Sequence, residues 1–185
     1  MTPYVAFIRA INVAGHASVR MSDVRDAFVA AGCKDVRTYI QSGNVMFAFP
    51  QRARAAVLQK IRAKLRDLLD DQPAVVFRSV RELEGMVRAA PFKRLETERD
   101  IKLYVGFLFR KPSPKPRFPL HSSREALEAV AMKNLEVFVV SRRKRNGFYG
   151  FPNNFIEHQL GVMATSRNWS TVTKIVGFVR RTPAG

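Results

Sequence analysis

The spacing of apolar and polar residues in the first eighty positions predicts four strands and two helices. Alternating or continuous apolar runs predict strands, and apolar residues at helical spacing predict helices. The predicted strands span 4–11, 36–41, 45–49 and 74–78, and the predicted helices span 22–31 and 51–69. Ser42-Gly43 is the expected turn of a hairpin between the middle two strands. This β-α-β-β-α-β order is typical of a ferredoxin-like antiparallel sheet.

A second series of elements follows. Ser79 and Glu82 have the spacing of a capping box, which predicts a helix to about residue 90. The same spacing at Ser122 and Glu125 predicts a helix to Met132. The remaining expected elements are strands at 101–109, 135–140, 147–151 and 162–165, a helix at 153–160 and a last helix at 169–179.

The element order predicts an α+β protein with two tandem ferredoxin-like halves. Each half is expected to have the order β-α-β-β-α-β and an antiparallel sheet, with one more helix at the C-terminus. The expected domains are 1–90 and 101–185, joined by a charged connector at 91–100.

Composition limits the class of protein. The chain has 185 residues, of which 46% are hydrophobic, and this is typical of a folded domain rather than a disordered polycation. No apolar run approaches the ~18 residues of a membrane span, and Met1 to Gly15 lack the features of a signal peptide. The single cysteine, Cys33, excludes an internal disulfide and favours the reducing cytoplasm. It is interpreted as a small packed residue rather than a reactive thiol.

Charge narrows the class of partner. The net charge is +17, with +6 from residues 1–90 and +11 from residues 91–185. Such an excess favours a polyanionic partner such as nucleic acid, although a soluble enzyme with a basic surface fits equally well. No membrane partner is expected, and the oligomeric state stays open.

Two groups of side chains are candidate binding residues. The first is polar and contains two arginines that turn chemistry and helix capping do not require, so it is a candidate site for a phosphate or carboxylate. It consists of Arg9, Asn12, Tyr39, Gln41, Ser42, Asn44, Ser166, Arg167, Asn168 and Thr171. Turns and caps alone would explain the serines and asparagines. The hypothesis is that these residues face one another across a cleft between the halves.

The second group is basic and is a candidate for nucleic-acid contact. It consists of Arg110, Lys111, Lys115, Arg117, Arg142, Arg143, Lys144 and Arg145. The first four lie in a proline-rich loop and the others at an expected hairpin turn. Phe148, Tyr149 and Phe151 follow that turn and are candidate stacking residues for single-stranded bases, as are Tyr39 and Trp169. A solvated charged hairpin and a Trp169 that anchors the core are the structural alternatives.

Catalytic signatures are absent from the sequence. The three histidines lack the spacing of metal ligands, and there is no P-loop, nucleophile elbow or CxxC pair. No metal or cofactor is therefore expected. Whether the protein is an enzyme stays open, because catalytic groups need only converge in space.

Three segments together resemble one family. Residues 4–15, YVAFIRAINVAG, are similar to its "LRGINVGG" motif. Residues 36–45, VRTYIQSGNV, are similar to its "VRTYIQSGNV" motif. Residues 160–172, LGVMATSRNWSTV, are similar to its "LGVxATTRNWNTV" motif. The chain is thereby identified as a member of the bacterial family with domain of unknown function 1697. The resemblance implies an α+β fold with ferredoxin-like halves and supplies no reaction. Ala10 and Ala14 stand where the family usually has glycine, which disfavours a phosphate-cradling loop there.

The sequence leaves more than one class of function. The first is binding of an anionic ligand, a nucleotide or single-stranded nucleic acid, through the polar site and the basic loops. The alternative is an enzyme acting on a small phosphorylated or carboxylated substrate in the cleft. A structural or regulatory interaction protein is a third class, because similar folds associate through sheet edges and faces.

Overall fold

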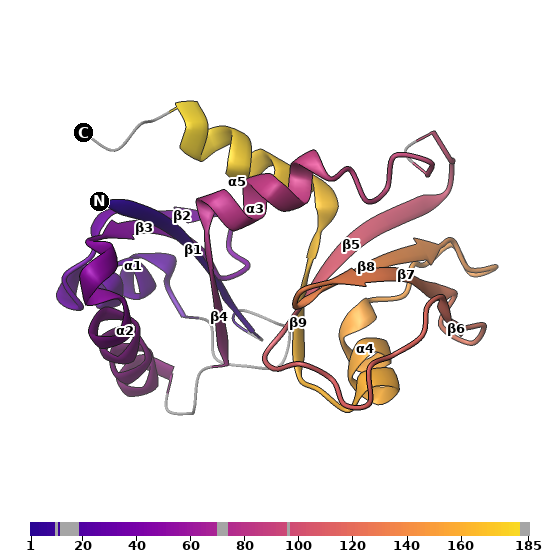
Figure 1. Cartoon of the computed structure of the whole chain (residues 1–185), viewed down its shortest axis with the longest axis horizontal. Coiled ribbons are helices and arrows are strands. Elements are labelled where there is room, and N and C mark those ends of the chain that lie inside the picture. Colours follow the sequence, from indigo (N-terminus) through magenta and orange to yellow (C-terminus); the bar gives the residue numbers. More distant parts are fainter. Residues whose placement is uncertain (10, 12–18, 70–73, 96, 182–185) are drawn as a thin grey trace. The chain divides into compact units, whose positions relative to one another are not determined.

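The computed structural model of the chain describes residues 1–9, 11, 19–69, 74–95 and 97–181. The chain divides into two compact units, one made of residues 1–84 with 175–185 and the other of residues 85–174. Each unit contains one antiparallel sheet, and a helix ends the described chain (Figure 1). The α+β class, the two antiparallel sheets and the C-terminal helix are as predicted.

The first unit has the predicted β-α-β-β-α-β order. Its strands form an antiparallel sheet in the order β2-β3-β1-β4, and α1 and α2 cover one face of that sheet (Figure 1). The elements are β1 (Thr2–Ile8), α1 (Met21–Ala30), β2 (Lys34–Tyr39), β3 (Asn44–Phe49), a 3-10 turn η1 (Gln51–Ala53), α2 (Arg54–Leu69) and β4 (Val75–Ser79).

Alternate strand residues build the core of this unit. Tyr4, Phe47 and Phe49 stack along the helix-covered face, where Phe28 of α1 meets Phe47 edge-on at 4.9 Å between ring centroids. Cys33 packs in the same cluster, and burial raises the pKa of its thiol to about 11. A thiol with so high a pKa is almost wholly protonated at neutral pH. The interpretation of Cys33 as a packed residue is therefore confirmed.

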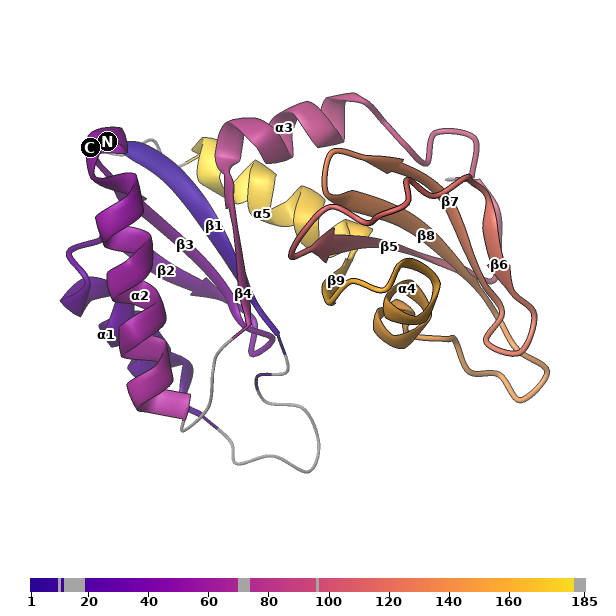
Figure 2. The same ribbon diagram turned by 60° about the horizontal axis from the view of Figure 1, so that its bottom comes forward.

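The second unit is built around β5, which lies between β8 and β9. Its antiparallel sheet has the order β6-β7-β8-β5-β9, and α4 packs on one face (Figure 2). The elements from residue 80 onward are α3 (Val80–Arg88), β5 (Ile101–Leu108), β6 (Leu120–Ser122), β7 (Leu127–Lys133), β8 (Glu136–Arg142), α4 (Pro152–Leu160), β9 (Ala164–Asn168) and α5 (Trp169–Arg181). The last residues of α5 belong to the first unit.

An aromatic cluster anchors both ends of the second unit. Phe92, in the segment before β5, is fully buried and meets Trp169 edge-on at 5.3 Å and Phe138 at 5.7 Å between ring centroids. Trp169 also packs against Phe138. Trp169, which is half-buried, therefore packs the start of α5 against the core, as its structural interpretation predicts.

The helix predicted from Ser122 to Met132 is wrong. The capping contact forms, because the Glu125 N–H donates to Ser122 Oγ at 3.3 Å. However, Ala126 adopts a φ of 53°, which ends the turn after residues 123–126 and starts β7. Pairing of β7 with β8 and β6 overrides the helix propensity of this segment. The second half consequently lacks the predicted β-α-β-β-α-β order.

Other expected elements differ less. The strand predicted at 147–151 is only an isolated bridge between Arg143 and Tyr149, and the strand predicted at 162–165 spans 164–168. The capping box at the start of α3 is confirmed, since the Ser79 N–H donates to Glu82 Oε2 at 2.7 Å and the Glu82 N–H donates to Ser79 Oγ at 3.3 Å.

Ala126→Gly distinguishes the observed turn from the predicted helix, because the two structures predict changes of opposite sign in the free energy of unfolding. Relief of an L-residue's left-handed strain, roughly 1–2 kcal/mol, exceeds the entropy that glycine loses on folding, roughly 0.5–1 kcal/mol. The free energy of unfolding in urea should therefore rise by about 0.5–1 kcal/mol. If this segment were a helix, the substitution would instead lower the free energy of unfolding by about 1 kcal/mol. Ala131→Gly, within β7, is the control and should lower the free energy by about 0.5–1 kcal/mol.

Candidate functional site

The structure brings part of the polar group together at one end of the first sheet. The N–H of Ile8, the last residue of β1, donates to the Gly43 carbonyl at 2.8 Å, and the next N–H, that of Arg9, donates to the Ala74 carbonyl at 2.8 Å. The end of β1 therefore lies against the β2–β3 turn. Arg9 and Gln41, two of the predicted ligand residues, project from these adjoining segments.

Two of the predicted ligand residues hold the turn itself. Asn44 is fully buried, and its Nδ2 donates to the Tyr39 carbonyl at 3.1 Å and to Ser42 Oγ at 2.8 Å. Gly43 has a φ of 70°, and a Cβ there would lie 2.9 Å from the Ile8 carbonyl oxygen and overlap the Ile11 side chain. Ser42 and Asn44 thus have the structural role that turn chemistry suggests.

The outer part of the turn is exposed. Ile40 is 56% exposed and has a φ of 50°, which is strained for a β-branched residue. Gln41 beside it is also exposed, and Tyr39 is half-buried. This turn presents an apolar side chain and an amide rather than a cationic surface.

The second part of the polar group lies in β9. Consecutive strand residues face opposite sides of a sheet. Ser166 faces α4, because a Cβ on Gly106 opposite it would overlap Ile156 of that helix and lie 3.3 Å from Ser166 Oγ. Arg167 faces the other side, where its Nη1 donates to Thr165 Oγ1 at 2.9 Å. Ser166 and Arg167 therefore do not share one site on this sheet.

Arg167 is a buried cation. It is 9% exposed, and its Nη1 also donates to the Ser166 carbonyl at 2.8 Å. Removal of the guanidinium from water lowers its pKa to about 10. The side chain keeps its charge at neutral pH.

The remaining polar candidates are dispersed. Asn168 is exposed at the end of β9, and Thr171 is half-buried on α5. Asn12, Ala10 and Ala14 lie outside the described residues. Arg9 and the β2–β3 turn belong to the first unit and Arg167 to the second, so a site shared by both motifs stays a prediction.

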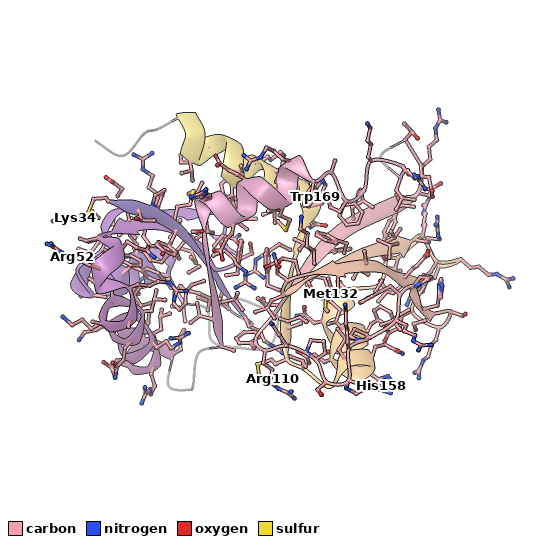
Figure 3. The ribbon with its side chains drawn as sticks, in the orientation of Figure 1. Lys34, Arg52, Arg110, Met132, His158 and Trp169 are labelled. Atoms are coloured by element: carbon pink, nitrogen blue, oxygen red, sulfur yellow. The ribbon has the colours of Figure 1, made fainter. Side chains whose placement is uncertain are left out.

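The two segments of the basic group begin at opposite ends of β5. The proline-rich loop starts after the last residues of β5, whereas Arg142 pairs with Ile101 at its beginning. At ~3.3 Å per strand residue, eight residues place these points about 25 Å apart. Arg110, labelled in Figure 3, has a structural partner, since its Nη2 donates to the Gly161 carbonyl at the end of α4 at 2.7 Å. Lys111, Lys115 and Arg117 are exposed.

The first two cations of the 142–145 run are neutralised by carboxylates. Arg142 Nη1 lies 2.6 Å from Glu98 Oε2, and its Nη2 lies 3.7 Å from Glu128. Arg143 Nη1 lies 3.3 Å from Asp100 Oδ1. The bond to Glu98 raises the pKa of Arg142 above its usual value.

The residues beyond them form a hairpin tip, which we call the tip (residues 144–148). Its backbone is fixed, because the Lys144 N–H donates to the Phe148 carbonyl at 2.8 Å and the Phe148 N–H donates to Asn146 Oδ1 at 3.1 Å. Gly147, with a φ of 82°, makes the reversal. The Phe148 side chain is nevertheless 72% exposed. Among the described residues, no carboxylate pairs with Lys144 or Arg145.

Further aromatic residues lie next to the tip in sequence. Phe151 is 55% exposed and rests edge-on against Tyr104, 5.6 Å away between ring centroids. Lys102 Nζ lies 4.5 Å from the centre of the Tyr149 ring. Sequence patterning did not single out Lys102, because its position over Tyr149 depends on strand register.

No other candidate centre stands out in the part of the chain that the structure describes. There, no three His, Cys, Asp or Glu side chains gather as a metal site requires. No described helix is long and apolar enough to cross a membrane. A cavity of about 140 Å³ lies beside the 123–126 turn and is lined by His121, Ser122 and Arg142 among others, and Arg142 is already paired with carboxylates.

The fold defines an α+β protein with one antiparallel sheet in each of two units. The model of the family described as "Protein of unknown function (DUF1697)" matches residues 1–138, and the chain belongs to this family. The structure of the conserved bacterial protein SP0830 from Streptococcus pneumoniae is similar, at 18% sequence identity and a TM-score of 0.65, over 96% of this chain and 98% of that one. This similarity concerns the fold. No curated protein matches the chain.

Gly43→Ala should destabilise the polar turn more than a positive φ alone explains. Left-handed strain and overlap with Ile8 and Ile11 together predict a loss of about 2–5 kcal/mol in the free energy of unfolding. Gly32→Ala is the control, because Gly32 has a φ of 90° but no atom lies within 4 Å of the position that a Cβ would take. Gly32→Ala should lower the free energy of unfolding by only about 1–2 kcal/mol. Equal losses in urea denaturation would contradict the close packing of the turn on β1.

Proposed function

We propose that the protein binds single-stranded nucleic acid through the tip of its second unit. The observation that carries this proposal is Phe148, a 72% exposed ring on a hydrogen-bonded hairpin tip that also carries Lys144 and Arg145. An aromatic face stacks with an unpaired base, and neighbouring cations attract the phosphates on either side of that base.

The surroundings of the tip support the same ligand class. Lys102 and the exposed ring of Phe151 extend the combination of cationic and aromatic side chains beyond the tip. Residues 85–174 carry 17 Lys and Arg against 7 Asp and Glu, so the unit as a whole attracts polyanions. Hydrogen bonds already fix the backbone of Phe148, so little backbone entropy is lost when a base stacks on its ring.

A single strand fits the tip better than a duplex or a membrane. Duplex bases are stacked on one another and leave no face for Phe148. Membrane association through basic residues and phenylalanine generally uses the apolar face of an amphipathic helix, whereas Phe148 lies on a hairpin. With Lys102, Lys144 and Arg145 contacting phosphates, log Kd should depend on log salt with a slope of about 2.

Phe148→Ala should weaken binding of fluorescein-labelled (dT)6 by roughly 5- to 150-fold in anisotropy titrations at low salt, since one stacked base contributes about 1–3 kcal/mol. Met163→Ala, which removes another half-exposed apolar side chain from the second unit, should leave the affinity unchanged. The proposal fails if wild-type protein does not bind (dT)6. The proposal also fails if wild-type protein binds duplex DNA or phosphatidylserine vesicles as tightly as it binds (dT)6.

The contributions of the tip and of the proline-rich loop to binding can be compared by removing two positive charges from each. Lys144→Ala with Arg145→Ala should reduce the salt slope for (dT)6 by about 1.4, or about 0.7 for each lost phosphate contact. Lys111→Ala with Lys115→Ala removes the same charge from the proline-rich loop, which leaves β5 at the end opposite Arg142, and should change the slope much less. Equal changes would mean that binding follows net charge and not the tip.

A further inference from the structure

Arg142 and Arg143 precede the tip directly, yet in the free protein their charges face carboxylates of the same chain. Glu98 and Asp100, from the segment before β5, each contact one of these guanidinium groups, at 2.6 and 3.3 Å. The Arg143 N–H also donates to the Asp100 carbonyl at 3.0 Å, which fixes this segment beside the hairpin. The backbone contact would hold the two segments together without the ion pairs.

These ion pairs are exposed. The side chains of Arg142 and Glu98 are 49% and 37% exposed, and those of Arg143 and Asp100 are 54% and 64% exposed. Ion pairs of this kind contribute little to stability and exchange readily with competing ions. A guanidinium group binds carboxylate and phosphate oxygens with the same planar geometry.

We propose that Arg142 and Arg143 form a phosphate-binding site that Glu98 and Asp100 occupy in the free protein. This inference rests on the function proposed for the tip. A single strand stacked on Phe148 extends its phosphates along the hairpin toward residues 143 and 142. There each phosphate takes the place of one carboxylate, and the displaced Glu98 and Asp100 side chains turn to solvent.

Glu98 and Asp100 would lower both the affinity for a strand and the salt dependence of that affinity. Each phosphate that reaches Arg142 or Arg143 must displace a carboxylate already there. The phosphate gives up its own condensed cation, but the displaced carboxylate attracts a cation in turn, so the net release of salt cations is small. Glu128 lies 3.7 Å from Arg142 and retains a weak contact with it when Glu98 leaves. The affinity for a strand is therefore lower, and its salt dependence shallower, than the number of cations on the hairpin suggests.

Glu98→Gln combined with Asp100→Asn tests this site. The double variant should bind (dT)6 about 3- to 10-fold more tightly, as expected when two exposed ion pairs no longer compete. Its salt slope should be steeper by about 1.4, since the cations released by the two phosphates at Arg142 and Arg143 are no longer offset by cations that displaced carboxylates take up. Asp23→Asn combined with Asp26→Asn is the matched control, because it removes the same charge and two exposed Arg–Asp pairs from α1.

Two further measurements complete the test. Addition of Arg142→Ala and Arg143→Ala to the double variant should abolish the gain in affinity. Glu98→Gln and Asp100→Asn, made singly, should each give about half the change in slope, so the result does not depend on the double variant alone. The inference is overturned if wild-type protein binds (dT)6 through Phe148 but the double variant binds no more tightly than its control. Loss of wild-type binding would instead overturn the function proposed for the tip.

Discussion

The antiparallel register between β5 and β8 determines what surrounds the hairpin tip. Because Ile101 pairs with Arg142 and Lys102 with Ser141, the beginning of β5 lies beside the end of β8. The residues just before β5, Glu98 and Asp100, therefore reach the first arginines of the hairpin. A one-residue slip in this register would reverse the faces of all β5 side chains and separate Lys102 from Tyr149.

The same register explains which properties of the second unit were predictable. Alternating apolar residues identified β5, and a largely apolar run identified β8, because each strand buries at least one face. Ser122 and Glu125 predicted a helix because the capping contact is local, and that contact does form. Only pairing with β8, a nonlocal interaction, determines that Ala126 turns the chain into β7. The first unit was more predictable because its Ser42-Gly43 turn, helix spacings and element order agree.

The candidate sites were predictable in residue type and less so in environment. Arg167 and Ser166 stood out as polar residues, but the sequence does not reveal that they point to opposite faces of β9 or that Arg167 is buried. Asn44 and Ser42 hold a turn, as local turn chemistry suggests. The ion pairs of Arg142 and Arg143 join residues more than forty positions apart, so no sequence pattern predicts them.

A high net charge therefore says little about where a polyanion binds. Of the eight cations predicted to contact nucleic acid, Arg110 bonds the end of α4, and Arg142 and Arg143 face carboxylates. The cations beside an exposed aromatic ring are those at the tip, Lys144 and Arg145. The family model ends at residue 138, before the tip begins. The function proposed for the tip consequently rests on this chain's own residues and not on its membership of the family.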